Sequence, residues 1–226
     1  MNIRQNIEEI KSKLPENVKL VAVSKTKSKE EILEVYNSGH KIFGENKVQE
    51  LVKKHDELPK DIEWHFIGHL QSNKVKYIAP FVHLIHGIDS FKLLMEINKE
   101  AAKNKRVIPC LLQFYIASEA TKSGLSLEKA QQILDSTEFT LMKNIKISGV
   151  MGMATFTDDE KQITSEFKML KTIFDMLKNE YFFDSESFCE ISMGMSDDFP
   201  LALNEGSTIV RVGSKIFGAR NYHETA

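Results

Sequence analysis

Lys19-Leu-Val-Ala-Val-Ser-Lys-Thr-Lys-Ser-Lys-Glu-Glu-Ile-Leu-Glu-Val-Tyr-Asn-Ser-Gly39 contains one complete strand, loop and helix. The apolar run Leu20–Val23 is short and valine-rich, which is typical of a buried parallel strand. The segment Lys29–Asn37 places its apolar side chains on one helical face, after Ser28 as N-cap and before Gly39 as C-terminal glycine. The stretch therefore predicts one β/α unit.

The same alternation continues along the rest of the chain. A helical pattern at Asn2–Lys13 precedes the first strand, and amphipathic patterns at Phe91–Lys103 and Asp158–Lys178 separate later ones. Eight strands alternating with helices predict an α/β fold, a (β/α)8 barrel of the TIM type with an extra N-terminal helix. An open, doubly wound sheet is the alternative, because it uses the same local pattern. The expected strands are Lys19–Ser24, Lys41–Phe43, Trp64–Ile67, Leu84–Gly87, Ile108–Tyr115, Ile147–Gly152, Cys189–Ser192 and Thr208–Val212.

Composition points to one domain in the cytoplasm. The 226 residues contain no linker rich in Pro, Gly or Ser, so we expect residues 1–226 to form a single domain. A net charge of −2 gives no reason to expect nucleic acid or an anionic membrane as a partner. No apolar run is long enough to span a membrane, and the charged start of the chain lacks the apolar core of a signal peptide.

The cysteine and histidine spacings do not predict a metal site. Cys110 and Cys189 each lie inside an apolar run, so we expect two buried, reduced thiols. His65 and His69 are four residues apart, which on a strand separates them by about 13 Å. We therefore exclude a metal shared by these two histidines. His69, at the end of its strand, faces either the barrel mouth or a structural partner.

Lys25 follows the first strand and would lie at the mouth of a barrel, where the active sites of this fold are built. Partial desolvation there would lower the pKa of the lysine, so that its neutral amine could attack an aldehyde. A solvated lysine after a strand is the alternative.

Two glycine-containing loops follow the seventh and eighth strands. Ser192-Met-Gly-Met-Ser196 comes after the seventh, and Gly213-Ser214 after the eighth. Loops at these positions are the usual phosphate site of such barrels, because glycine lets the backbone approach the ligand and serine hydroxyls add donors. An N-cap role for Ser196 is compatible with phosphate contact.

Arg211 lies in the middle of the eighth strand, between two valines, and must point opposite to them. On the inner face its guanidinium would be buried and would need a partner, which the ring nitrogen of a bound cofactor would supply. On the outer face it would pair with a helix carboxylate. Strand parity alone does not choose between the two.

Several stretches together resemble the pyridoxal phosphate homeostasis protein family, also called the YggS/PROSC family, which is similar to the barrel of alanine racemase. The resemblance rests on motifs in the same order over nearly the whole length. They are Val21-Ala-Val-Ser-Lys-Thr-Lys27, Phe43-Gly-Glu-Asn46 with Val48-Gln-Glu50, Trp64-His-Phe-Ile-Gly-His-Leu-Gln71, Ser192-Met-Gly-Met-Ser196, and Gly206-Ser-Thr-Ile-Val-Arg-Val-Gly-Ser214 with Ile216-Phe-Gly218.

The resemblance implies pyridoxal 5'-phosphate (PLP) as cofactor, held as a Schiff base on Lys25. It also implies Arg211 near the pyridine nitrogen, with Asn46 and His69 in the cofactor's surroundings. The implied phosphate contacts are Ser192, Met195, Ser196, Gly213 and Ser214.

This sequence departs from the family pattern at a few positions. Ser28 stands where proline is usual, Lys47 where tyrosine is usual, and Tyr115 where an asparagine is usual. The segment 113–124 matches the family only loosely, so contacts from the loop after the fifth strand are not predicted.

An arginine beside the pyridine nitrogen stays charged and disfavours protonation of that nitrogen, which makes a weak electron sink. Racemisation also needs a second base, which alanine racemase-like enzymes take from a further domain that we do not expect here. We therefore expect a PLP carrier in intracellular PLP homeostasis, monomeric and without catalytic residues, that transiently meets PLP-dependent apoenzymes. The alternatives are a small PLP-dependent amino-acid racemase or lyase, and a phosphate-binding barrel enzyme that forms an aldolase-like imine without PLP.

Overall fold

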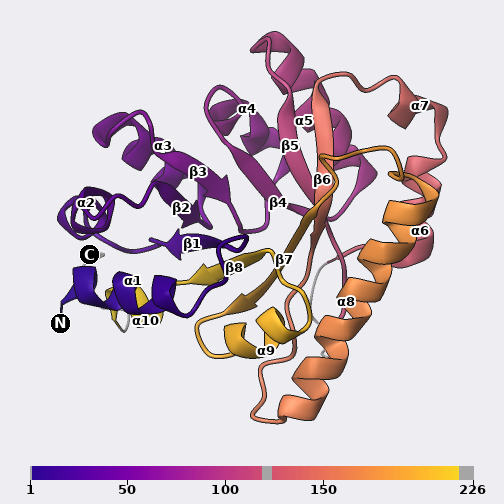
Figure 1. The fold of residues 1–226 in the computed structure, drawn as a ribbon. Coiled ribbons are helices and arrows are strands. Elements are labelled where there is room, and N and C mark those ends of the chain that lie inside the picture. The colour runs from indigo at the N-terminus through magenta and orange to yellow at the C-terminus, as the bar shows by residue number, and fades with distance from the viewer. Residues whose placement is uncertain (1, 119–123, 219–226) are drawn as a thin grey trace.

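Eight parallel strands close into a barrel in a computed structural model that describes residues 2–118 and 124–218 (Figure 1). Each strand pairs with the next in the chain, and the last pairs with the first. The barrel prediction is confirmed, and the open sheet is excluded by the pairing of Val21 with Arg211. The strands are β1 (Lys19–Val23), β2 (Ile42–Glu45), β3 (Glu63–Phe66), β4 (Leu84–Ile88), β5 (Ile108–Gln113), β6 (Ile145–Met151), β7 (Glu190–Met195) and β8 (Ile209–Val212).

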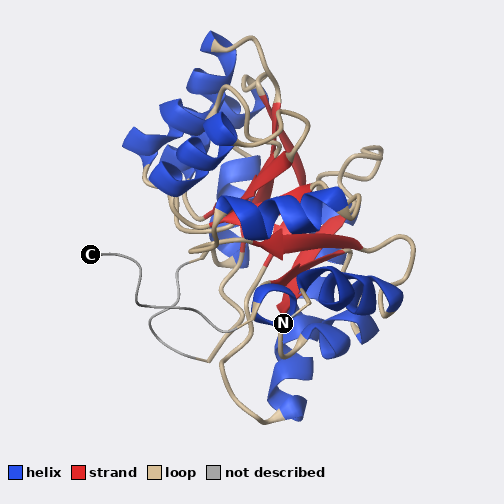
Figure 2. Ribbon diagram, turned by 90° about the vertical axis from the view of Figure 1, so that its left-hand side faces the viewer, coloured by secondary structure: helices blue, strands red, loops and turns tan. Residues whose placement is uncertain are grey.

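Helices cover the outside of the barrel (Figure 2). Their starts follow the predicted caps: the Ser28 hydroxyl accepts from the Glu31 N–H in a full capping box, and Ser90 and Ser126 cap two later helices. They are α1 (Ile3–Ser12), α2 (Lys29–Asn37), α3 (Val48–Glu57), the 3-10 turn η1 (Ser72–Lys74), α4 (Val75–Ile78), α5 (Phe91–Lys103), α6 (Leu127–Leu134), α7 (Thr137–Thr140), α8 (Glu160–Glu180), α9 (Phe199–Asn204) and α10 (Ser214–Phe217).

The extra helix α1 lies beside α10 (Figure 1), and the Asn6 amide donates to the Ile216 carbonyl at 2.9 Å. The helix after β8 is thereby tied to the helix before β1. No helix among the described residues is long and apolar enough to cross a membrane.

Alternation along the strands separates two apolar regions. Trp64 and Phe66 face the helices and join the large outer core, whereas His65 between them faces the barrel interior. The interior core is small and consists of Val21, Leu84, Leu111, Met151 and Ile209. Much of the remaining interior is polar, with buried residues such as His65, His86, Ser192 and Arg211, and buried polar groups need partners.

The prediction of two buried thiols is right for Cys110 and wrong for Cys189. Cys110 lies inside β5 and is fully buried, while Cys189 is exposed. The reason is a strand boundary: β7 begins at Glu190, so Cys189 precedes the strand and packs in neither core.

Candidate functional site

A pocket of about 280 Å³ opens at the carboxyl ends of the strands. Its volume is near the lower end of the range for small-molecule sites, about 300 Å³. Seven of the nine predicted cofactor residues line it: Lys25, Asn46, Met195, Ser196, Arg211, Gly213 and Ser214.

Lys25 is half-buried in the loop after β1, and hydrogen bonds hold that loop in place. Thr26, the next residue, has a left-handed backbone with φ of 64°, and its N–H donates to Glu50 at 2.6 Å. On the other side, the Lys54 ammonium donates to the Ser24 carbonyl at 2.7 Å. Both holding groups come from α3, so the helix after β2 positions the lysine after β1.

A buried carboxylate completes this support. Glu45 ends β2 with no exposed surface, accepts from the Ser24 hydroxyl at 2.6 Å and pairs with Lys54 at 2.7 Å. Burial raises the pKa of Glu45 to about 7, although the Lys54 ammonium opposes that rise. Sequence reasoning quoted Glu45 only as part of a motif and missed this role. Its signal was a charged residue at the end of a short apolar strand.

Arg211 points into the barrel and is 5% exposed. Its guanidinium donates to the Ser192 hydroxyl at 2.6 Å and to the Gly152 carbonyl at 3.2 Å. Burial lowers the pKa of Arg211 to about 10, which leaves it charged at neutral pH. Ser192 does not line the pocket, and it acts as a support for Arg211 behind the lining.

Ser192 also begins a buried chain of imidazoles. Its hydroxyl is 2.9 Å from Nδ1 of His86, and Nε2 of His86 is 3.0 Å from Nδ1 of His65. Burial lowers the pKa of His65 to about 3 and that of His86 well below its ordinary value, so both rings are neutral at pH 7. His86 was missed from sequence, although a histidine amid the apolar residues of β4 was a visible signal.

The two predicted phosphate loops lie together at the pocket. The Gly213 N–H donates to the Ser196 hydroxyl at 3.2 Å and so joins the loops after β7 and β8. A Cβ on Gly213 would lie 3.1 Å from the Val23 carbonyl oxygen, so a side chain there would press against β1. Asp198 also lines the pocket, and it accepts from the Met195 N–H at 2.5 Å.

Of the two residues predicted in the cofactor's surroundings, Asn46 lines the pocket and His69 lies outside it. The Asn46 side-chain oxygen is buried and has no hydrogen-bond partner within the part of the chain that the structure describes. An orphaned buried acceptor at a pocket wall is the kind of atom that a ligand satisfies. His69 does not line the pocket: its side chain is 64% exposed, and Nδ1 lies 3.1 Å from Asp89.

The family follows from comparison of the sequence with known proteins. The family described as "Alanine racemase, N-terminal domain" matches residues 1–221. A pyridoxal phosphate homeostasis protein of Aquifex aeolicus is 42% identical over 206 residues, which cover 90% of this chain and 88% of that protein. This chain belongs to the pyridoxal phosphate homeostasis protein family. A second member, from Helicobacter pylori, is 41% identical over 88% of this chain and 87% of its own length.

Two solved structures have the same barrel fold. PipY of Synechococcus elongatus, solved with PLP bound, superposes with a TM-score of 0.87 and is 32% identical in sequence. The match covers 96% of this chain and 100% of the PipY chain. Alanine racemase of Clostridium difficile superposes with a TM-score of 0.80 at 14% identity, over 99% of this chain and 61% of that enzyme. The second similarity shows a shared fold.

The departures from the family pattern do not enter the pocket lining. Ser28 caps α2, Lys47 precedes α3, and Tyr115 follows β5, and none of the three lines the pocket. Of the loosely matching segment 113–124, residues 119–123 lie outside the described residues. On either side of them, Phe114 and Leu125 form a parallel bridge.

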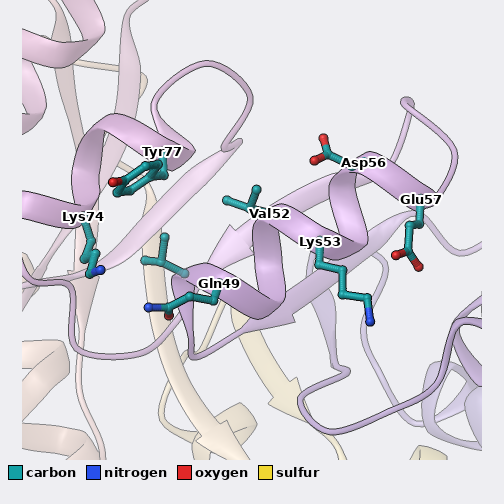
Figure 3. Close-up of a pocket in the computed structure, with 8 residues that line it drawn as sticks. Gln49, Val52, Lys53, Asp56, Glu57, Lys74 and Tyr77 are labelled. Carbon is teal, nitrogen blue, oxygen red and sulfur yellow. The ribbon is translucent and has the colours of Figure 1, made fainter.

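A wider depression of about 550 Å³ lies on the outer surface between α3, η1 and α4 (Figure 3). Gln49, Val52 and Lys53 project from α3, and Lys74 and Tyr77 come from the neighbouring segment. It shares no residue with the pocket at the strand ends and contains none of the predicted cofactor residues. We therefore place the functional site at the strand ends.

Proposed function

We propose that the protein binds PLP as a Schiff base on Lys25 and holds it in reserve for intracellular PLP homeostasis. One observation carries the proposal: Lys25, Arg211 and the two serine loops line the same pocket. The names of its relatives and the PLP bound in PipY support the choice of ligand. The chemistry of the pocket lining fits PLP. It offers the amine of Lys25, serine hydroxyls, the Arg211 cation and a buried acceptor oxygen on Asn46.

The predicted cofactor residues that line the pocket would each have one task. Lys25 would supply the amine that joins the aldehyde carbon of PLP through a C=N bond, with the carbonyl oxygen lost as water. Ser196, Gly213, Ser214 and the Met195 backbone would contact the phosphate. Arg211, supported by Ser192, would face the ring nitrogen. Asn46 would use its unpaired oxygen on a polar edge of the ring.

The lining favours holding over turnover. Arg211 is charged at neutral pH and keeps the facing ring nitrogen unprotonated, which weakens carbanion stabilisation. Among the described residues, no histidine or tyrosine lines the pocket to act as a second base. Of its two carboxylates, Asp198 accepts from the Met195 N–H and Asp197 is exposed. Residues 1–226 would form one domain, and the protein would act as a cytoplasmic monomer that passes PLP to apoenzymes.

Borohydride trapping tests the attachment point. The protein mixed with PLP should gain visible imine absorption, and reduction followed by peptide mapping should place the label on Lys25. Lys25→Ala should lose that absorption, while Lys27→Ala is the matched control because Lys27 lines the same pocket. A label on Lys27, or on any other lysine, would refute the proposal.

Amino-acid turnover separates the carrier from an enzyme. Holoprotein incubated with single enantiomers of several amino acids should leave them unchanged. Racemisation or product release that disappears in Lys25→Ala would favour the racemase or lyase instead.

A further inference from the structure

Three metal-ligating side chains meet at the end of the barrel opposite the cofactor pocket. Glu63 is the first residue of β3, His65 lies two residues further on the same face, and His83 lies just before β4. One nitrogen or oxygen atom of each residue lies within 4.8 Å of those of the other two. The spacing that excluded a metal shared with His69 does not apply, because the fold supplies other partners to His65.

His65 already has the neighbour that a ligating histidine requires. It is 2% exposed, and its Nδ1 lies 3.0 Å from Nε2 of His86. The neutral tautomer with its hydrogen on Nδ1 donates to His86 and leaves the Nε2 lone pair for an ion. Outer partners of this type fix the tautomer and orientation of metal-bound imidazoles.

The other two side chains are free to complete the geometry. The side chains of Glu63 and His83 are 43% and 53% exposed, and their nearest atoms, Oε2 and Nε2, are 3.5 Å apart. Ligands on a tetrahedral zinc ion lie about 3.3 Å from one another, given Zn–N distances of about 2.0 Å. The His65 and His83 rings are stacked, with their centroids 5.6 Å apart and their planes 7° apart. The exposed His83 ring must therefore rotate to turn its lone pair toward an ion held by the rigid His65.

We propose that Glu63, His65 and His83 bind a divalent transition-metal ion of the zinc class, with water as the fourth ligand. Two imidazoles and one carboxylate suit zinc, whereas magnesium and calcium prefer oxygen ligands alone. Lys19, a nearby positive charge that acts on His65, is paired with Glu190. The cation therefore does not face an uncompensated ammonium.

Zinc titration of the untagged protein against a chromophoric chelator tests the site. Every protein in the series carries Cys189→Ser, which removes the exposed thiol as a competing ligand. The reference protein should bind one equivalent, and His83→Ala and Glu63→Gln should each weaken binding at least about tenfold. Both substitutions are at exposed positions, so the fold is retained. Magnesium in excess should not displace the zinc.

His55→Ala is the matched control, because His55 also contacts a carboxylate, Asp56 at 3.4 Å, but belongs to no three-ligand group among the described residues. It should bind zinc like the reference. Cobalt should give the visible bands of a four-coordinate ion in the reference and not in His83→Ala. Equal zinc affinity in the reference and His83→Ala, or equal weakening by His55→Ala, would overturn the proposal. Because no readout uses PLP, failure here is separate from failure of the cofactor proposal.

Discussion

Glu45 lies fully buried at the end of β2, next to Ser24 and Lys54, in the network that supports the Lys25 loop. One of its oxygens accepts two hydrogen bonds, while the other has no partner among the described residues. A carboxylate in such a place is costly to ionise because burial removes it from water, and the nearby Glu50, which also pairs with Lys54, adds to that cost. The network therefore makes the support of Lys25 sensitive to pH.

Glu45→Gln should remove that sensitivity. The pKa of Glu45 is about 7 in the folded protein against 4.5 ordinarily, so the fold binds this proton more tightly than the unfolded chain. Its contribution to stability is complete below pH 4.5 and is lost as the pH rises to about 7. The free energy of unfolding should fall over that interval, relative to Glu45→Gln, by no more than about 3 kcal/mol. Urea unfolding at several pH values measures it, and parallel profiles would contradict it.

Arg211 shows how far single residues can be read from sequence. Parity placed its side chain on the face opposite to Val210 and Val212, but parity does not say which of the two faces of the strand is the inner one. The decision came from the pairing of β8 with β1 and β7, which turns Arg211 toward Ser192. Lys25 and both serine loops needed no such knowledge, because they follow strands and the carboxyl ends of barrel strands share one face.

Among the elements, β6 is irregular where it meets its neighbours. The register between β5 and β6 shifts after Cys110, so that Leu111 pairs with Gly149. Gly149 has φ of 151°, and a Cβ there would lie 1.8 Å from the Glu190 carbonyl oxygen. The strand can pass β7 at this distance only without a side chain.

Gly149→Ala should therefore cost at least about 3 kcal/mol of unfolding free energy, since backbone strain and a clash with a strand backbone act together. Gly39→Ala is the control: Gly39 has φ of 84°, but nothing lies within 4 Å of the position that a Cβ would take. That change should cost only about 1 kcal/mol, from backbone conformation alone. Urea denaturation measures both, and equal losses would show that the contact with Glu190 is unimportant.

Element boundaries were less predictable than the elements themselves. The expected strand Cys189–Ser192 is in fact Glu190–Met195, so most of the Ser192–Ser196 motif belongs to a strand. The expected strand Ile108–Tyr115 ends at Gln113. Apolar runs mark where a chain is buried, whereas strand ends depend on hydrogen bonds to neighbouring strands that local sequence does not contain.

For the whole molecule, the sequence pattern did not decide whether the sheet closes into a barrel or stays open. It rests on bonds between distant segments, such as the Lys19 N–H donating to the Thr208 carbonyl at 2.8 Å. A closed and an open sheet share every local unit, so only such contacts distinguish them. Closure also creates the interior through which His65, His86 and Ser192 connect the metal-ligand cluster to Arg211.

The two cysteines can report whether the barrel opens as one unit. Cys189 is exposed, whereas Cys110 lies inside β5 with no exposed surface, and burial raises the pKa of its thiol. β5 is bonded on both sides, to β4 and β6, so its exposure requires rupture of the closed sheet. Native protein treated with iodoacetamide should therefore gain one label per chain, and protein in urea two. Cys189→Ser should gain no label on the time scale on which the native protein gains one, and any slow labelling of Cys110 should occur at the rate of global unfolding. Rapid native labelling of Cys110 would mean that the barrel opens locally at β5.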